Sequence, residues 1–202
     1  EQVRRRLEVA RAEVGEFAQY EYVVVNDQVE PAVERLRAIV LAGHGSAFCA
    51  GADLNWMKRA REFTPDENRA DAAKLARMLR TIYESPKPVV ARVHGPAFAG
   101  GMGLVAACDI AVASTDAKFC LSEVKLGLIP AMISPYVMRR IGTAKARRFF
   151  LNTRSFDAAE AVAIGLLDRA VAAQDLDAAV QEEIDLTLQC APGAVTKIKR
   201  LI

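Results

Sequence analysis

The sequence predicts an α/β fold in which strands and helices alternate at first and helices dominate the last third of the chain. Short apolar runs rich in β-branched residues, at Val89–Val93 and Ile110–Ala113, are typical of buried strands. The segment Pro65–Tyr83 instead spaces its apolar residues as an amphipathic helix does. With 202 residues, of which 52% are hydrophobic, the chain can bury one substantial core.

The first part of the chain contains strands and helices in turn. The expected elements are a helix from Gln2 to about Phe17, a strand at Tyr22–Val25, a helix at Glu30–Leu36, a strand at Arg37–Leu41, a short helix at Asp53–Arg59 and the helix Pro65–Tyr83. Within this last helix, the spacing of Ala72, Leu75, Met78, Leu79 and Ile82 indicates that these side chains face the core. The prolines that follow end the helix.

The rest of the chain is mainly helical. We expect strands at Val89–Val93, Ile110–Ala113, Phe119–Leu121 and Arg169–Val171, and helices at Gly101–Cys108, Ala131–Ile141, Ala144–Leu151, Ala158–Ile164, Leu176–Leu188 and Ala194–Leu201. The arginines of two of these helices, Arg139, Arg140, Arg147 and Arg148, are expected on a solvated face or a subunit contact.

Composition argues against several classes of protein. The formal net charge is only +2, so a nucleic-acid partner is not expected. No apolar run approaches the length of a membrane span, and the chain does not open with a signal peptide, so we expect no membrane partner and a cytoplasmic location. The cysteines show no CxxC pair and only two histidines are present, so no metal site is expected. All four cysteines are interpreted as small buried residues: Cys49, Cys108, Cys120 and Cys190.

Two glycine-containing loops each follow an apolar strand and run into a helix, at Ala47–Leu54 and His94–Gly103. Small residues let a ligand approach the main chain, and the first N–H groups of a helix are unpaired donors. Two such loops facing one another could bind a carbonyl oxygen that becomes an oxyanion. The spacing equally allows the glycines to serve only as turns.

The residues of the first loop and of several motifs after it resemble those of the crotonase (enoyl-CoA hydratase/isomerase) family. The similarity covers about residues 39–202 and runs through Ser85–Ala91, Gly100-Gly101, Cys108-Asp109-Ile110 and Gly127–Pro130. It implies a ClpP/crotonase-like core of repeated β-β-α units in a spiral, followed by a helical C-terminal region. Within the family, Phe119–Gly127 with Ile133–Tyr136 is most similar to bacterial methylglutaconyl-CoA hydratases of leucine breakdown.

The resemblance carries functional residues over to this sequence. The two amides of the oxyanion hole fall on Ala52 and Gly100, and the catalytic carboxylate falls on Glu123, which would move protons between water and the acyl carbons. The residues implied in substrate and coenzyme A binding are Ala50, Gly51, Ala52, Asp53, Leu54, Gly100 and Gly101. No cofactor is implied beyond the coenzyme A of the acyl-CoA substrate. A complete fold of this kind implies a homotrimer or hexamer.

Two positions depart from the family pattern. Hydrating members often carry a second glutamate where this chain has Gly103, and a single carboxylate is also the pattern of members that move a double bond. Glycine is usual at this position in the methylglutaconyl-CoA hydratase branch, so the resemblance favours hydration. The second departure is Ala99, which adds a methyl group beside the oxyanion hole where many relatives have glycine.

Residues 1–38 instead resemble the C-terminal end of guanylate kinases. The similarity lies in the arginine-rich helix with Arg5 and Arg6 and in the Val-Asn-Asp turn at Asn26. No GxxxxGK[ST] phosphate loop accompanies it, so kinase activity is not expected. The resemblance also implies that the crotonase-like domain is truncated at both ends, and a non-catalytic fragment that binds coenzyme A is therefore an alternative.

A dinucleotide-binding site is a further alternative. The segment Gly101–Ala106 fits G-x-G-x-x-A, and Glu123 lies twenty residues after Gly103. That fingerprint should begin directly after its strand, whereas Gly95–Gly100 intervene here, and the helix ending near Cys108 is short for a βαβ crossover. Both features argue against the binding of NAD.

Overall fold

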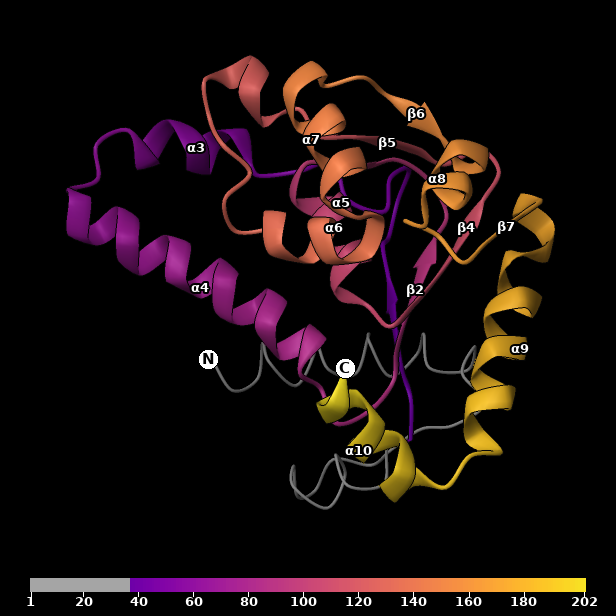
Figure 1. Ribbon diagram of the computed structural model, residues 1–202. Helices are drawn as coiled ribbons and strands as arrows, with labels where there is room; N and C mark the ends of the chain where they lie inside the picture. The colour runs from indigo at the N-terminus through magenta and orange to yellow at the C-terminus, as the bar shows by residue number, and fades with distance from the viewer. Residues whose placement is uncertain (1–36) are drawn as a thin grey trace, which may run out of the picture. The chain divides into compact units, whose positions relative to one another are not determined.

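The computed structural model describes residues 37–202, and its centre is a parallel sheet (Figure 1). Its strands are β1 (Ile39–Ala42), β2 (Val89–Val93), β4 (Ile110–Ser114) and β7 (Arg169–Val171), in the order β1-β2-β4-β7. The four strands are all parallel, so each pair needs a crossover, and helices supply most of these connections. The alternation predicted from the sequence is thus confirmed for this part of the chain.

A second, smaller sheet lies beside the first and contains β3 (Ala97–Phe98), β5 (Lys118–Cys120) and β6 (Phe156–Asp157). β3 pairs with β5 in parallel, and β5 pairs with β6 in antiparallel orientation. The loop after β1 also joins this sheet, because Cys49 forms a parallel bridge with Ala97. β3 and β6 were not predicted, since two residues are too few to show an alternating pattern.

The helices agree with the predicted positions to within a few residues. They are α3 (Leu54–Ala60), α4 (Pro65–Tyr83), α5 (Gly100–Ala107), α6 (Ser134–Ile141), α7 (Thr143–Asn152), α8 (Ala158–Ile164), α9 (Leu176–Leu188) and α10 (Pro192–Leu201), with 3-10 turns η2 (Glu123–Leu126) and η3 (Ala173–Asp175). The largest difference is at α6, which begins at Ser134 and not at Ala131. Its first turn contains Pro135, which is well tolerated there.

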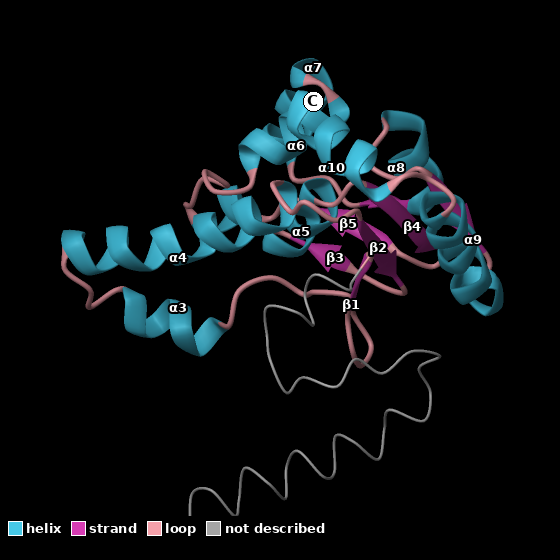
Figure 2. Cartoon of the chain, turned by 90° about the horizontal axis from the view of Figure 1, so that it is seen from below, coloured by secondary structure: helices cyan, strands magenta, loops and turns pink. Residues whose placement is uncertain are grey.

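The larger sheet is covered on both faces, as a parallel sheet requires. On one face α9 packs against β2 and β4 through a small apolar cluster (Figure 2). The opposite face carries the main core, which includes α5 and parts of α6, α7 and α8. Helix α5 lies inside this core, and six of its eight residues are buried.

Helix α4 differs from the others because it extends, with α3, to one side of the two sheets (Figures 1 and 2). A capping box fixes its start: Thr64 accepts from the Glu67 amide, and the Glu67 carboxylate accepts from the Thr64 amide. Leu79 is the one fully buried residue of the helix. The prediction that Leu75 and Met78 face the core is wrong, since their exposures are 39% and 43%.

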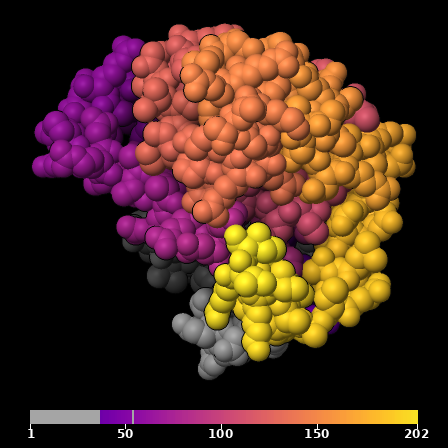
Figure 3. Space-filling view, in the orientation of Figure 1, coloured from indigo at the N-terminus to yellow at the C-terminus, as the bar shows by residue number. Residues whose placement is uncertain are grey.

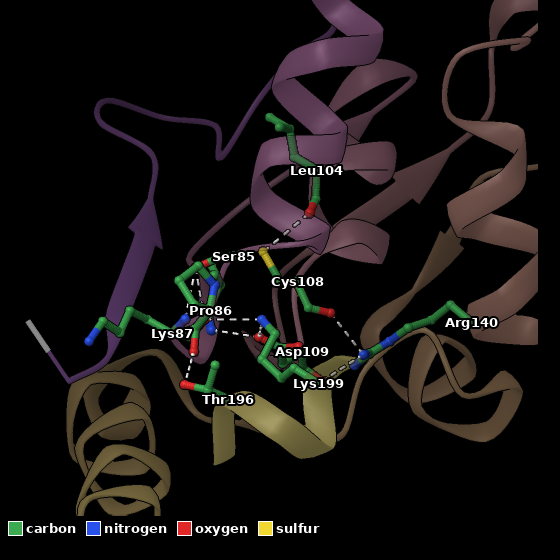
Figure 4. Close-up of polar contacts among 10 residues, drawn as sticks. Ser85, Pro86, Lys87, Leu104, Cys108, Asp109, Arg140, Thr196 and Lys199 are labelled. Carbon is green, nitrogen blue, oxygen red and sulfur yellow. Dashed lines mark hydrogen bonds and ion pairs between the residues drawn. The ribbon is translucent and has the colours of Figure 1, made fainter. Parts of the chain in front are cut away.

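A polar network joins the starts of β2 and β4 to α6 and α10 (Figure 4). The Asp109 carboxylate accepts from the Val89 amide and from the Lys199 ammonium group, which also donates to the Lys87 carbonyl. Arg140 donates to the carbonyls of Cys108, Asp109 and Leu166 and pairs with Asp168. Arg140 is therefore not on a solvated helix face, because its side chain is only 14% exposed and donates to three main-chain carbonyls.

The cysteines do not share one environment. Cys108 and Cys120 are buried as predicted, whereas Cys49 is half-buried and Cys190 is exposed, so the prediction is wrong for these two. Cys190 follows α9 and precedes α10, a connection at the surface of the described region. In the space-filling view α10 also lies on the surface (Figure 3), which agrees with the exposure of Leu201.

The helix, strand and helix predicted within residues 1–36, together with their resemblance to guanylate kinase, lie outside the described residues. Among residues 37–202, no helix is both long enough and apolar enough to cross a membrane.

Candidate functional site

A cavity of about 470 Å³ opens at the N-terminal end of α5. Residues from five places in the sequence line it: the loop after β1, helix α3, helix α4, the start of α5, and the segment from Ser122 to Ile133. Of the residues implied in binding, the lining includes Ala50, Gly51, Ala52 and Gly100. The two glycine-containing loops therefore come together on one cavity, as the sequence allowed.

The backbone at the start of α5 leaves hydrogen-bond donors at this cavity. Within residues 37–202, neither the Ala52 amide nor the Gly100 amide donates to a main-chain carbonyl. Gly100 is the first residue of α5, where helical amides have no partner in the preceding turn and the helix dipole favours negative charge. Ala52 and Gly100 both line the cavity, and N–H groups of this kind can stabilise an anionic oxygen.

Close packing between the two loops explains their small residues. A Cβ atom on Gly101 would lie 2.8 Å from the Cβ of Cys49, so a larger residue would separate α5 from the loop after β1. Gly51 has φ +106°, a conformation that side chains disfavour. Ala99 has φ +48° although it is not glycine, and its amide donates to the Cys120 carbonyl. The turn into α5 is thus held in a strained conformation.

The other implied binding residues have separate positions. The Asp53 carboxylate accepts from the Asn55 amide at 2.7 Å and caps α3. Leu54 is the first residue of α3, and Gly101 is fully covered at the start of α5. Neither Asp53 nor Gly101 is part of the cavity lining.

Glu123 is the one charged side chain among the described residues that line the cavity. It begins η2, and Gly127 ends that turn with φ +71°. Its Oε2 atom is buried and, among the described residues, has no hydrogen-bond partner. Burial raises the pKa of the Glu123 carboxyl above its ordinary value of 4.5. A carboxylate in this state can exchange a proton with a bound ligand or with water.

The remaining walls are apolar and were largely missed from the sequence. Leu75 and Met78 of α4 form one wall, and the other contains Leu126 at the end of η2 with Leu128 and Ile129 from the loop that follows. The helical spacing of Leu75 and Met78 was visible in the sequence, but spacing alone does not distinguish a wall of a cavity from a core face. In residues 37–202, no group of three or more metal-ligating side chains is present.

The fold and the cavity define a class of protein: an α/β domain with a largely apolar cavity lined by two residues whose main-chain N–H groups are free within the described residues and by one half-buried carboxylate. A profile of the family described as enoyl-CoA hydratase/isomerase matches residues 28–201. This match covers most of the 202 residues, so the chain belongs to the enoyl-CoA hydratase/isomerase family.

Individual relatives agree with this assignment. Enoyl-CoA hydratase ACTT6 of Alternaria alternata is 35% identical over 180 residues, which cover 86% of this chain and 57% of the relative. The crystal structure of an enoyl-CoA hydratase from Shewanella pealeana superposes with a TM-score of 0.80 at 42% identity, covering 85% of this chain and 65% of that one. An enoyl-CoA hydratase from Mycobacterium smegmatis gives 0.78 at 35% identity, covering 82% and 63%.

These comparisons confirm the crotonase-like α/β fold expected from the sequence. The chain spans about half the length of the curated relatives that it matches, with 53% and 57% of two of them covered.

Proposed function

We propose that this chain adds water to the double bond of an α,β-unsaturated acyl-CoA, with Glu123 as its catalytic carboxylate and the amides of Ala52 and Gly100 as its oxyanion hole. The observation that carries the proposal is the buried Oε2 atom of Glu123, which has no hydrogen-bond partner among the described residues, in a cavity that Ala52 and Gly100 also line. Membership of the enoyl-CoA hydratase/isomerase family supports it.

The first step is stabilisation of charge on the thioester oxygen. Two N–H groups that hold this oxygen draw electron density from the conjugated double bond and leave the β-carbon open to attack by water. Each such donor lowers the barrier by roughly 3 kcal/mol, because it is already oriented and need not be reorganised from solvent. The dipole of α5, acting through Gly100, adds to this effect.

A single carboxylate can complete the addition. Ionised Glu123 accepts one proton of the water molecule while the water oxygen bonds to the β-carbon, and the electron pair of the double bond moves into the thioester enolate. The protonated Glu123 then gives that proton to the α-carbon, the enolate returns to a thioester, and the carboxylate is restored. The raised pKa of Glu123 favours the first transfer, since it makes the carboxylate a stronger base towards the water molecule.

The finer proposal concerns the acyl group. The similarity of Phe119–Gly127 and Ile133–Tyr136 to methylglutaconyl-CoA hydratases supports methylglutaconyl-CoA as the substrate and leucine breakdown as the process. The acyl chain of that substrate ends in a carboxylate, and no lysine or arginine is among the cavity residues within 37–202. A countercharge for this substrate would therefore come from outside that lining.

Isomerisation is the second candidate, and Gly103 is the observation that favours it. An isomerase needs one group that removes a proton from one carbon and returns it to another, which Glu123 alone could do. This reaction would use the same oxyanion hole but no added water.

The test measures all these activities on the purified chain. Crotonyl-CoA, methylglutaconyl-CoA and a 3-enoyl-CoA are supplied separately, and the absorbance of the conjugated thioester is followed: hydration lowers it, and isomerisation of the 3-enoyl-CoA raises it. Loss of a general acid–base group reduces such rates by about 10²–10⁴-fold, so we expect this reduction for Glu123→Gln. The matched control is Glu62→Gln, a change of an exposed glutamate outside the cavity.

Each outcome selects one reading. Loss of signal with crotonyl-CoA or methylglutaconyl-CoA supports hydration, and their rates relative to one another identify the preferred acyl group. A gain of signal with the 3-enoyl-CoA alone supports the isomerase. If none is turned over, the enzymatic proposal is refuted, and binding of coenzyme A by a non-catalytic domain is the reading that stands.

A further inference from the structure

Gly103 lies on the side of α5 that leads to the cavity. It is three residues after Gly100, which lines the cavity, so the two occupy the same face of the helix. A side chain at position 103 would extend towards Ile133, which lines the same cavity as Glu123. Gly103 is itself fully covered, which means that another residue already occupies that space.

That residue is Ile133, the last residue before α6. Helices α5 and α6 lie side by side (Figures 1 and 2), and Ile133 is only 2% exposed at their contact. A Cβ atom on Gly103 would lie 2.6 Å from the Cβ of Ile133 and closer still to its Cγ2. Real Cβ atoms do not approach one another so closely, so even alanine at position 103 requires a displacement.

Rotation of the Ile133 side chain cannot remove this overlap. A change of χ1 moves Cγ2 but leaves Cβ where it is, and β-branched residues have few alternative rotamers. The backbone of Ile133 is held as well, because its carbonyl accepts from the amides of Tyr136 and Val137, both at 3.1 Å. A side chain at position 103 therefore has to move the start of α6.

We propose that Ile133 is a specificity-determining residue of this site. Its side chain occupies the space that a second carboxylate, at position 103 of α5, would need, so Glu123 acts without a second carboxylate from α5. This inference rests on the proposed function, since it explains why one carboxylate does the chemistry. Ile133 lines the same cavity as Glu123, so the space it fills adjoins the reacting groups.

The packing part of the proposal is tested by thermal unfolding of Gly103→Ala in four backgrounds. In a helix without overlap, glycine to alanine is stabilising and raises the Tm of a chain of this size by about 2–4 °C. We expect Gly103→Ala to lower the Tm in the wild-type background and in Ile133→Val, which retains both Cβ and Cγ2. The decrease in Tm should be smaller in Ile133→Ala, which lacks Cγ2. In Ile133→Gly, Gly103→Ala should raise the Tm.

Equal Tm shifts in all four backgrounds would overturn the proposal, because they would show that positions 103 and 133 do not interact. Should Ile133→Gly fail to fold, the comparison of the valine and alanine backgrounds still decides the question. Activity is not needed for this series, so it remains informative even if the wild-type chain turns over no acyl-CoA and the proposed function is refuted.

The chemical part is tested by the swap Gly103→Glu with Ile133→Gly, which transfers a side chain of similar volume across the α5–α6 contact. Its matched control is Gly103→Gln with Ile133→Gly. We expect the glutamate swap to show a higher ratio of hydration to isomerisation than the control, and to add a second ionisation to the pH profile of kcat/KM. Identical ratios and profiles in the two swaps would show that a carboxylate at position 103 does not reach the reacting groups.

Discussion

Replacement of Ala99 by glycine should stabilise this protein, although alanine to glycine usually does the opposite. Ala99 has φ +48° and ψ −117°, angles of the first central residue of a type II′ turn, where glycine is preferred. Three hydrogen bonds hold it there: its amide donates to the Cys120 carbonyl at 2.8 Å, and its carbonyl accepts from the amides of Met102 and Gly103. The structure around Ala99 therefore imposes the strain.

The expected gain follows from two opposing effects. Relief of a sparsely populated backbone conformation is worth about 1–3 kcal/mol. The greater freedom of glycine in the unfolded chain costs about 0.5–1 kcal/mol. The net effect of Ala99→Gly is a stabilisation of about 1 kcal/mol, which corresponds to a rise in Tm of about 2–4 °C for a chain of this length.

Thermal and urea unfolding measure this change, with Ala97→Gly as the matched control. Ala97 lies two residues earlier on β3, is fully buried and has no positive φ, so glycine there should destabilise the protein by about 1 kcal/mol. A loss of stability for Ala99→Gly as large as that for Ala97→Gly would refute the argument from strain. We also expect lower turnover with the glycine variant, because the adjacent Gly100 amide would be held less rigidly.

Three further predictions concern other residues. Burial raises the pKa of Glu123, so the folded chain binds its proton more tightly than the unfolded chain. The stability of the wild type therefore falls as pH rises from 4.5 through the raised pKa. Glu123→Gln lacks this titration, so its Tm relative to wild type should increase across that pH window. Arg140→Lys should cost about 1–3 kcal/mol in chemical unfolding, because lysine cannot reach all the carbonyls that Arg140 contacts, whereas Arg147→Lys on an exposed position should have no measurable effect. Burial raises the pKa of Cys108 to about 12, so a thiol reagent at pH 8 should modify exposed Cys190 first and Cys108 only on unfolding. A mass-spectrometric time course measures the order, and early labelling of Cys108 would contradict it.

Sequence by itself determined the elements with strong local signals. The predicted bounds of α4, β2, α8, β7 and α9 agree with the structure at both ends. Apart from the short β7, these segments have an apolar period or a dense β-branched run, and caps or prolines mark several of their limits. The two loops around the cavity were also recognised, because small residues in a fixed order depend little on distant contacts.

Only the tertiary structure decided how these elements form a site. Strand β3 exists because Cys49 and β5 flank it, and Leu75 and Met78 form a cavity wall because α4 extends beyond the sheets. The raised pKa of Glu123 depends on its burial among residues from separate segments. The pairing of Gly103 with Ile133 joins two helices thirty positions apart in the sequence. Local patterns report which face of a segment is apolar, but what lies against that face depends on long-range packing, and so burial, strain and excluded volume became visible only in the folded chain.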